Sequence, residues 1–232
     1  DVSGGLGLRR YLESAGHTFV VTSDKDGPNS VFERELVDAD IVISQPFWPA
    51  YLTAERIKKA KKLKLAITAG IGSDHVDLAA ANEHKITVAE VTFSNSISVA
   101  EHSVMMILSL VRDYLSQHEI ARSGGWDIAA ATARSYDVEG MQVGVIAAGR
   151  IGLAVLERMK PFSVGLHYFD FHRLPTSVEQ ELGLTYHKSA QALAAACDVV
   201  SIHTPLTPAT DSMFNAKFFA GMKRGSYIVN CA

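Results

Sequence analysis

The chain has 232 residues, of which 47% are hydrophobic and 20% charged, a composition typical of a globular protein with one or two domains and an ample core. Its formal net charge of −3 argues against nucleic acid or an anionic membrane surface as the main partner. The longest uncharged apolar run near the middle, residues 103–111, is too short to span a bilayer.

The chain has two cysteines, Cys197 and Cys231, and each lies in an apolar run. A single pair in a chain of this length is a poor disulfide framework, so we expect two buried thiols. Free thiols indicate a reducing compartment, and we therefore expect a cytoplasmic protein.

Strands and helices alternate along the first half of the chain. The pattern predicts strands at 17–22, 40–44, 65–69 and 86–91. It predicts helices at 6–15 and 31–37, and two more that begin after the capping residues Thr53 and Asp77. Alternation of this kind indicates parallel βαβ units.

Five lysines follow Thr53 within a short stretch: Lys58, Lys59, Lys61, Lys62 and Lys64. The simplest interpretation is a solvated helix face with positive charge near its carboxyl end. A phosphate-binding patch is the alternative interpretation.

The longest helix is expected between the two halves of the chain. Ser98 and Glu101 have the spacing of a capping box, so the helix is predicted to begin at Ser98 and to continue to about Ala121. Its apolar positions exceed one stripe, which indicates burial on more than one side. An irregular arm is expected at 127–140.

The stretch from 143 to 170 carries the strongest functional signal. Its first residues are apolar, as in a strand buried on both faces. Ala147, Gly149 and Gly152 then have the spacing of the dinucleotide-binding fingerprint, with alanine in the first glycine place. Asp170 closes a second apolar strand eighteen positions after Gly152, where a carboxylate can accept the ribose hydroxyls. A tight turn with a capping aspartate explains the glycines but not the spacing of the acid.

The βα alternation continues to the end of the chain. Strands are predicted at 184–186, 199–203 and 227–232, and helices after a capping box at Thr176 and Glu179, after Ser189, and at 215–222. The fold class is therefore α/β, with two doubly wound domains at 1–95 and 96–232, the second a Rossmann-type NAD-binding domain. The second half has about five candidate strands, against roughly six in a complete dinucleotide-binding fold, and the first half opens on a helix with no strand before it. Both domains are therefore expected to be incomplete.

Four motifs in the chain resemble a known group. They are PFWPAYLT (46–53), TAGIGSDHVDL (68–78), NSISVAEH (95–102) and AAGRIG (147–152). Together they resemble the D-specific 2-hydroxyacid dehydrogenases and, within these, the NAD-dependent formate dehydrogenases. The glycine turn and VAEH are shared across the superfamily, whereas PFW and NSIS are the parts that single out formate.

The resemblance implies a homodimeric enzyme that oxidises formate to CO₂ by direct hydride transfer to NAD in a cleft between two domains. It implies that Ile71 and Asn95 hold formate and that Pro46 and Phe47 wall the substrate pocket. The residues that it implies line NAD are Ser96, Arg150, Ile151, Asp170, Pro205, Leu206, Thr207, Pro208, Ala209 and Cys231, which join Gly149 and Gly152 of the fingerprint.

The sequence departs from the family at several places. Phe171 stands where the family usually has arginine, and Cys231 where it usually has threonine, so polar contacts to the cofactor are weakened. The substrate-clamping arginine of the family directly follows the motif that ends here at Ala232, and a Gln–His pair comes later. We therefore expect the chain by itself to be inactive.

The residues implied for the substrate fit the chemistry of formate. Hydride transfer from formate removes no O–H proton, so the site must orient the carboxylate and exclude water rather than supply a base. Glycines on both sides of Ile71 would let its N–H point into a cleft. The alternatives are that Pro46 and Phe47 pack in a core and that Asn95 is a turn residue before a helix.

The same residues leave two other functions open and favour one cofactor. A dehydrogenase of larger D-2-hydroxy acids and an NAD(H)-sensing, corepressor-like protein stay open as alternatives. Asp170 would repel the 2′-phosphate of NADP, and Phe171 offers no cation, so NAD is expected. His75 and His102 lie near the motifs without metal-ligand spacing, so we expect structural histidines and no metal.

Overall fold

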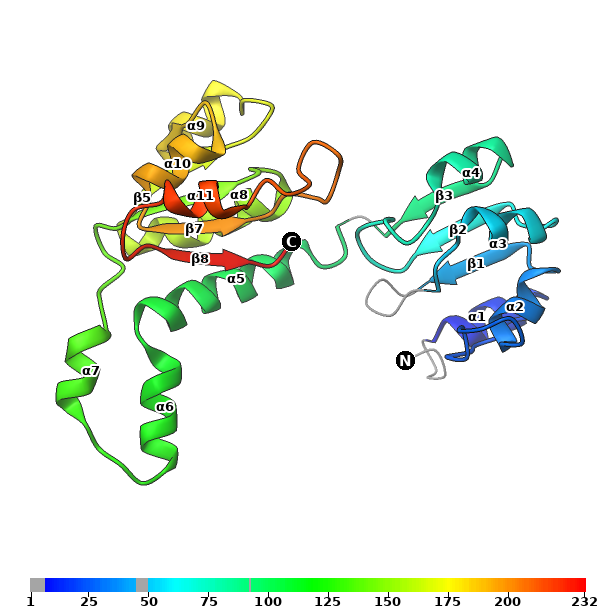
Figure 1. Ribbon diagram of the computed structural model, residues 1–232, viewed down its shortest axis with the longest axis horizontal. Helices are drawn as coiled ribbons and strands as arrows, with labels where there is room; N and C mark the ends of the chain where they lie inside the picture. The colour runs from blue at the N-terminus through cyan, green and yellow to red at the C-terminus, as the bar shows by residue number, and fades with distance from the viewer. Residues whose placement is uncertain (1–6, 45–49, 92) are drawn as a thin grey trace. The chain divides into compact units, whose positions relative to one another are not determined.

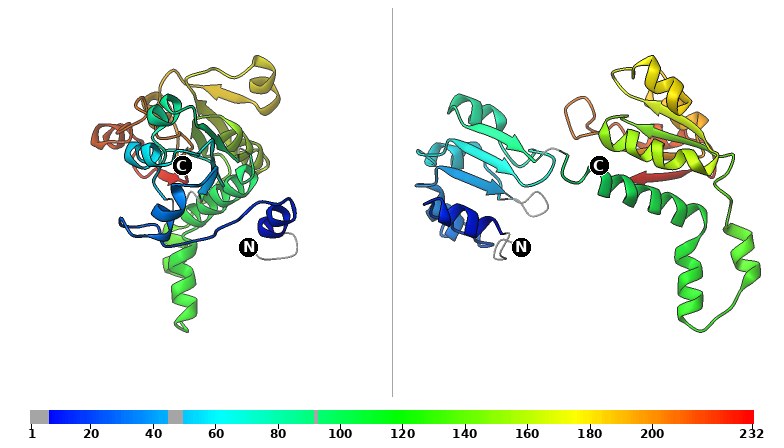
Figure 2. Two further views of the ribbon diagram at one scale, coloured as in Figure 1. Left: turned by 90° about the vertical axis from the view of Figure 1, so that its right-hand side faces the viewer. Right: turned by 180° about the vertical axis from the view of Figure 1, so that it is seen from behind.

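A computed structural model of the chain describes residues 7–44, 50–91 and 93–232. The chain divides into two compact units, Asp1–Thr92 and Phe93–Ala232, which Figures 1 and 2 draw from three directions. This division falls three residues before the domain boundary placed from the sequence. Each unit is described by itself.

The amino-terminal unit contains a parallel sheet of β1 (Ile41–Ser44), β2 (Leu65–Thr68) and β3 (Thr87–Glu90), in that order. Its helices are α1 (Leu8–Ser14), α2 (Val31–Leu36), α3 (Ala54–Lys59) and α4 (Leu78–Glu83). Leu36, Ile57 and Ala81 of α2, α3 and α4 are buried in one apolar cluster with Val42 of β1 and Ala66 of β2. The predicted βαβ alternation is confirmed here.

Two helix starts in this unit agree with the sequence. The Thr53 side chain accepts a hydrogen bond from the Arg56 N–H, and Asp77 accepts one from the Ala80 N–H. The strand expected at 17–22 is wrong, because this segment pairs with no strand among the residues that the structure describes. Val20 and Val21 are about half exposed, so the apolar pattern there is not matched by burial.

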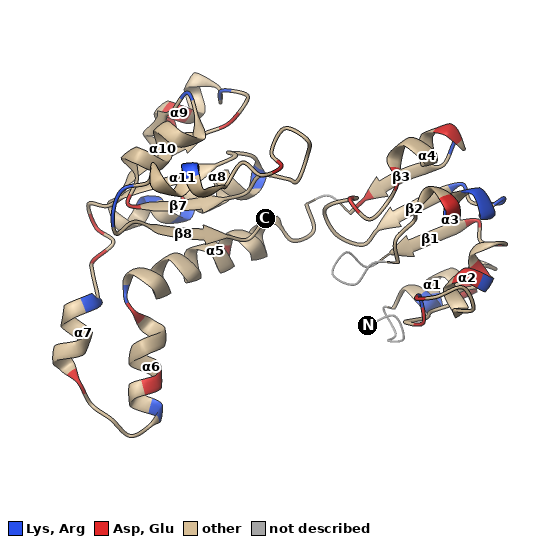
Figure 3. Ribbon diagram, in the orientation of Figure 1, with Lys and Arg blue, Asp and Glu red and all other residues tan. Residues whose placement is uncertain are grey.

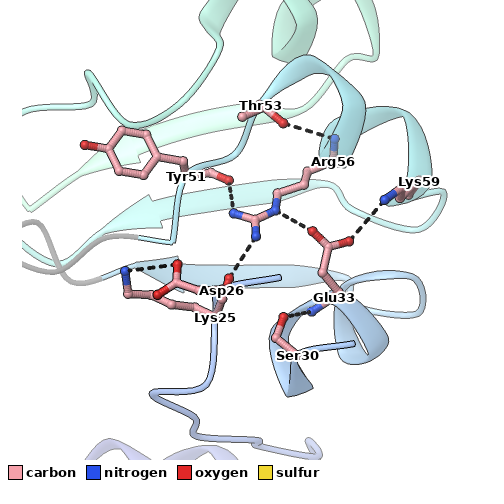
Figure 4. Close-up of polar contacts among 8 residues, drawn as sticks. All are labelled: Lys25, Asp26, Ser30, Glu33, Tyr51, Thr53, Arg56 and Lys59. Carbon is pink, nitrogen blue, oxygen red and sulfur yellow. Dashed lines mark hydrogen bonds and ion pairs between the residues drawn. The ribbon is translucent and has the colours of Figure 1, made fainter. Parts of the chain in front are cut away.

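A buried ion pair ties α2, α3 and the loop before α2 together (Figure 4). The Glu33 carboxylate accepts a hydrogen bond of 2.6 Å from Arg56 Nε and lies 3.2 Å from Lys59 Nζ. The other Arg56 nitrogens donate to the carbonyl oxygens of Tyr51 and Lys25, at 2.7 and 2.8 Å. Both charged groups are largely buried, so each satisfies the other in the interior of the unit.

The lysine run after Thr53 lies at the end of α3 and beyond it, where the ribbon in Figure 3 is blue for lysine and arginine. Three of these lysines form ion pairs: Lys59 with Glu33, Lys62 with Asp38 and Lys64 with Asp40. Because nearby carboxylates offset much of the charge, the solvated-face interpretation fits better than a phosphate-binding patch.

The carboxy-terminal unit is built on a five-stranded parallel sheet in the order β6-β5-β4-β7-β8. The strands are β4 (Gln142–Ile146), β5 (Gly165–Phe169), β6 (Leu184–Tyr186), β7 (Val199–Ile202) and β8 (Tyr227–Asn230). The chain moves outward from β4 to β6 and then crosses back to β7 and β8. This reversal defines a doubly wound Rossmann-type sheet, with its switch point between β4 and β7.

Helices cover both faces of this sheet (Figure 1). On one face, α5 (Ser96–Val111) and α8 (Arg150–Met159) share an apolar cluster with Val143 and Val145. On the other face, α10 (Ala190–Ala196) and α11 (Ala216–Ala220) share a cluster with Ile146 and Val200. β4 is therefore buried on both faces, as its sequence predicts.

The long helix expected from Ser98 to Ala121 is wrong in two respects. The helix begins at Ser96, so Ser98 lies inside its first turn and cannot act as the cap. It ends at Val111, because Asp113 adopts a left-handed backbone conformation (φ +51°) before α6 (Tyr114–Arg122) starts.

The arm and the second capping box also differ from expectation. A short helix, α7 (Ile128–Arg134), occupies part of the arm expected to be irregular, and the Asp127 side chain caps it. Thr176 begins α9 (Thr176–Leu182) without a side-chain cap. Glu179 of α9 instead binds side chains outside the helix.

Candidate functional site

The turn after β4 lies at the switch point of the carboxy-terminal sheet, where doubly wound folds bind their ligands. Ala147 leaves the strand with a φ of +75°, a conformation that glycine adopts without strain and alanine does not. Its N–H donates to the Phe169 carbonyl oxygen at 2.8 Å, which holds the turn against β5. Alanine therefore occupies the first glycine place of the fingerprint in the backbone conformation of a glycine.

The two fingerprint glycines do different work. A Cβ on Gly152 would lie 2.2 Å from the Ala147 carbonyl oxygen, so only glycine lets α8 lie this close to the turn. A Cβ on Gly149 would meet no atom within 4 Å, so the space above the turn is open. Gly149 is also the residue before α8, whose free N–H groups favour an anion at that end. These features fit a bound diphosphate.

Asp170 directly follows β5 and is half-buried beside this turn. One carboxylate oxygen accepts a hydrogen bond of 2.9 Å from the Ala148 N–H, and the other accepts one of 3.0 Å from the His172 N–H. A carboxylate has about four acceptor positions, so lone pairs are left for ribose hydroxyls. Its spacing in the sequence thus corresponds to a place beside the turn.

Arg150 is the exposed first residue of α8, and Ile151 packs partly into the cluster beneath the sheet. The Arg150 guanidinium carbon lies 3.2 Å from the centre of the Phe93 ring. Phe93 itself has a φ of +81°. Phe93 could not be predicted as a neighbour of Arg150, because the two residues lie far apart in the sequence.

The turn from Pro205 to Ala209 follows β7 and is exposed. Buried Thr210 holds it: the Thr210 hydroxyl donates to the Pro205 carbonyl oxygen at 2.5 Å and accepts from the Thr207 N–H at 2.8 Å. Thr210 was not predicted as part of this turn, although a threonine directly after TPLTPA is a residue type that often closes turns. Leu206 is 73% exposed at the tip of the turn.

His203 directly follows β7 and was not predicted as a site residue. Its Nε2 lies 2.9 Å from the Ser201 hydroxyl, whereas its buried Nδ1 has no hydrogen-bond partner in the described part of the chain. Burial lowers the pKa of His203 to about 4, so the ring is neutral near pH 7. Its position directly after a fully buried strand could have indicated a place at the ligand-binding edge of the sheet.

Ser96 and Cys231 were both expected beside the cofactor. Ser96 is buried at the start of α5. Cys231 follows β8, is partly exposed, and its Sγ lies 3.6 Å from the Met106 Sδ of α5. Cys231 and Cys197 are free thiols, as expected, but only Cys197 is buried, so the expected burial of Cys231 is wrong. Burial raises the pKa of Cys197 to about 12.

The residues expected to hold formate fall in different parts of the chain. Ile71 follows β2 in the amino-terminal unit and is 40% exposed, next to Gly72 with a φ of +99°. Asn95 precedes α5 without capping it, and its buried Oδ1 accepts no hydrogen bond from the described residues. Pro46 and Phe47 lie outside the described residues.

Two further observations bear on the kind of protein. His75 is buried with its Nε2 3.5 Å from the Thr68 hydroxyl, consistent with a structural role. No helix in the described ranges has the length and hydropathy required to cross a bilayer.

Comparison with known proteins shows which family the chain belongs to. Residues 104–232 match the family described as "D-isomer specific 2-hydroxyacid dehydrogenase, NAD binding domain". The chain is 68% identical to a formate dehydrogenase of Pseudomonas sp. (strain 101), over all of this chain and 58% of that protein. It is 53% identical to a formate dehydrogenase of Neurospora crassa, over 98% of this chain and 61% of that protein.

Similar solved structures include formate dehydrogenases. A Granulicella formate dehydrogenase is 70% identical with a TM-score of 0.95, over all of this chain and 61% of that one. An NAD-dependent formate dehydrogenase from Staphylococcus aureus, solved with NAD, is 43% identical with a TM-score of 0.86, over 97% of this chain and 66% of that one. The chain spans about 60% of the length of the curated relatives it matches. The chain belongs to the family of D-isomer specific 2-hydroxyacid dehydrogenases, and its carboxy-terminal unit is their NAD-binding domain.

Proposed function

We propose that the protein is an NAD-dependent formate dehydrogenase. The observation that carries the proposal is Asp170 bonded to the Ala148 N–H beside an open glycine turn. That arrangement offers one acceptor for an adenosine ribose and one anion site for a diphosphate. Formate as the substrate is supported by the identity with the formate dehydrogenases of Pseudomonas and Neurospora.

The carboxy-terminal unit would hold the cofactor in this function, and the amino-terminal unit would serve as the substrate domain. Gly149, Arg150, Ile151 and Gly152 would surround the diphosphate, and Asp170 would accept the ribose hydroxyls. The residues proposed for the remainder of NAD are Ser96, the turn of Pro205, Leu206, Thr207, Pro208 and Ala209, and Cys231.

The proposed reaction requires little acid–base catalysis by the protein. NAD, when bound, accepts the hydride that formate loses as it becomes CO₂. The protein would orient the carboxylate and exclude water, with the Ile71 N–H and the Asn95 amide as donors and Pro46 and Phe47 as apolar walls. No group has to remove a proton, so the neutral state of His203 is compatible with the reaction.

We further propose a homodimer in the cytoplasm. Large apolar side chains are exposed along α5, α6, α7 and the segment between α6 and α7, including Met105, Leu115, Trp126 and Ile128 at 51%, 66%, 86% and 60%. A second copy of the chain would cover such a surface. The two free thiols support a reducing compartment.

The test is a comparison of substrates with the full-length protein. Reduction of NAD is followed with formate and with the larger acids D-lactate and D-glycerate, and kcat/KM is determined for each. The proposal expects formate to be the preferred substrate by a wide margin. Preference for a larger acid would replace it with the D-2-hydroxyacid dehydrogenase alternative, and NAD binding without turnover of any acid would support the corepressor-like alternative.

A further inference from the structure

A buried carboxylate lies under the loop that begins at Asp170. Glu179 of α9 has a side chain only 10% exposed. Its Oε1 accepts hydrogen bonds from the Tyr168 hydroxyl and from Arg173 Nε (2.9 Å), and its Oε2 accepts from Arg173 Nη2 (3.0 Å). A carboxylate this buried needs a charged partner, and Arg173 supplies it through two nitrogens.

Arg173 is the cation of this loop. It is the only lysine or arginine between Asp170 and Gly183 in the sequence. Its guanidinium also lies 5.1 Å from the centre of the Tyr186 ring, while 64% of the side chain is exposed. The Arg173 hydrogen bonds are the main reason that the pKa of Glu179 is lowered, so the pair stays ionised at neutral pH.

The loop is anchored on both sides of Arg173. At its start, the Asp170 carboxylate binds the N–H groups of Ala148 and His172. At its end, the Leu174 N–H donates to the Tyr168 hydroxyl at 3.0 Å. Arg173 thus lies three residues after the proposed ribose ligand, in a loop whose backbone is fixed, with its charge directed to Glu179.

NADP differs from NAD by a phosphate on the ribose that Asp170 would bind. Rossmann domains that accept NADP place an arginine near this phosphate. Two of the five N–H donors of the Arg173 guanidinium bind the Glu179 carboxylate, and the negative charge of that carboxylate offsets the attraction of Arg173 for a phosphate. Arg173 is thus a cation that could bind the 2′-phosphate of NADP, but it is paired with Glu179.

We propose that Glu179 is a specificity-determining residue, which favours NAD by holding the Arg173 guanidinium away from a 2′-phosphate. The inference rests on the proposed function, because it requires the adenosine ribose to bind at Asp170. Asp170 would repel the 2′-phosphate directly. Glu179, nine residues later on α9, would disfavour NADP in a second way, by neutralising the nearby cation.

The test measures the dissociation constants of NAD and NADP by calorimetry on the full-length protein and three variants. Glu179→Gln keeps the shape and an acceptor for Tyr168 but removes the charge that binds Arg173. We expect NADP affinity to rise about tenfold, with NAD affinity within twofold of wild type. The gain should shrink at high salt, because it comes from an exposed cation.

Two further variants separate this effect from a structural one. The double variant Glu179→Gln/Arg173→Gln lacks the released cation, so its ratio of NAD to NADP affinity should return to the wild-type value. Tyr168→Phe removes the hydroxyl that contacts Glu179 and Leu174 but leaves the Arg173–Glu179 pair. Its affinity ratio should equal that of wild type.

An unchanged affinity ratio in Glu179→Gln would overturn the inference, and so would a gain that persists in the double variant. If circular dichroism shows that Glu179→Gln does not fold, Arg173→Lys replaces it, since lysine pairs through one nitrogen and should give a gain of about threefold. No gain there counts against the inference. If the wild-type protein binds no NAD, the proposed function itself fails, which is a distinct result.

Discussion

The Asp170 carboxylate accepts a 2.9 Å hydrogen bond from the backbone N–H of Ala148. This bond joins the end of β5 to the turn after β4, two segments that lie 22 residues apart in the sequence. The proposed ribose ligand and the proposed diphosphate site are therefore parts of one hydrogen-bonded unit. A change in either is expected to affect the other.

Replacing Asp170 tests the ribose assignment. Asp170→Ser removes the negative charge that would repel a 2′-phosphate and shortens the acceptor. NAD affinity should fall by about tenfold and the gap to NADP should narrow, which equilibrium binding of both cofactors would measure. A variant that keeps the full preference for NAD would show that Asp170 is not the ribose ligand.

The two fingerprint glycines should separate folding from binding. Gly152→Ala places a Cβ against the Ala147 carbonyl oxygen, so the turn must shift, at a cost of about 2–3 kcal/mol in the free energy of unfolding. Gly149→Ala enters open space and should leave stability within about 0.5 kcal/mol of wild type. It should nevertheless weaken NAD binding, because the methyl group occupies the space proposed for the diphosphate.

Urea unfolding and NAD titration of both variants provide the check. The prediction is contradicted if Gly149→Ala destabilises the fold as much as Gly152→Ala, or if it binds NAD as tightly as the wild-type protein.

The apolar and polar patterns in the sequence were sufficient for the local features of the site. The run before Ala147 predicted a strand buried on both faces, and the spacing from Gly152 to Asp170 predicted the acid beside the turn. These predictions succeed because strand, turn and helix here depend on neighbouring residues and on burial that is continuous along β4.

Features that depend on distant partners were not predictable. Thr176 and Glu179 have the spacing of a capping box, yet Glu179 binds Tyr168 and Arg173, which lie outside its helix. The strand expected at 17–22 had the right residue types but lacks a pairing partner among the described residues. Asp113 interrupts an apolar pattern that is otherwise helical, and only its left-handed backbone reveals the break.

His203 should make stability depend on pH. Its pKa lies near 4 in the folded protein, against an ordinary value of 6.5, so the unfolded chain binds the proton more tightly. The stabilising contribution is present above pH 6.5 and is lost as the pH falls toward 4. The total loss is about 3 kcal/mol.

The measurement is the free energy of unfolding of wild type and His203→Asn between pH 7 and pH 4. The difference between the two proteins should change across this interval, because asparagine does not titrate. A constant difference would mean that the His203 ring does not have the lowered pKa that keeps it neutral in the folded protein.

The Glu33–Arg56 pair should matter more than the exposed ion pairs of the same unit. Arg56→Met leaves the buried Glu33 carboxylate with Lys59 alone and should lower the free energy of unfolding by about 2–3 kcal/mol. Lys62→Met is the matched control, since its pair with Asp38 is exposed on both sides and should have no measurable effect. Equal effects in thermal unfolding would argue against a special role for the buried pair.

The most direct test of the proposed function is the fate of the formate hydrogen. The full-length protein is supplied with deuterated formate and NAD, and the reduced cofactor is examined by mass spectrometry and proton NMR. Direct transfer predicts one deuterium on the nicotinamide ring of every reduced cofactor. Unlabelled reduced cofactor, or no reduction by formate at all, would contradict the proposal.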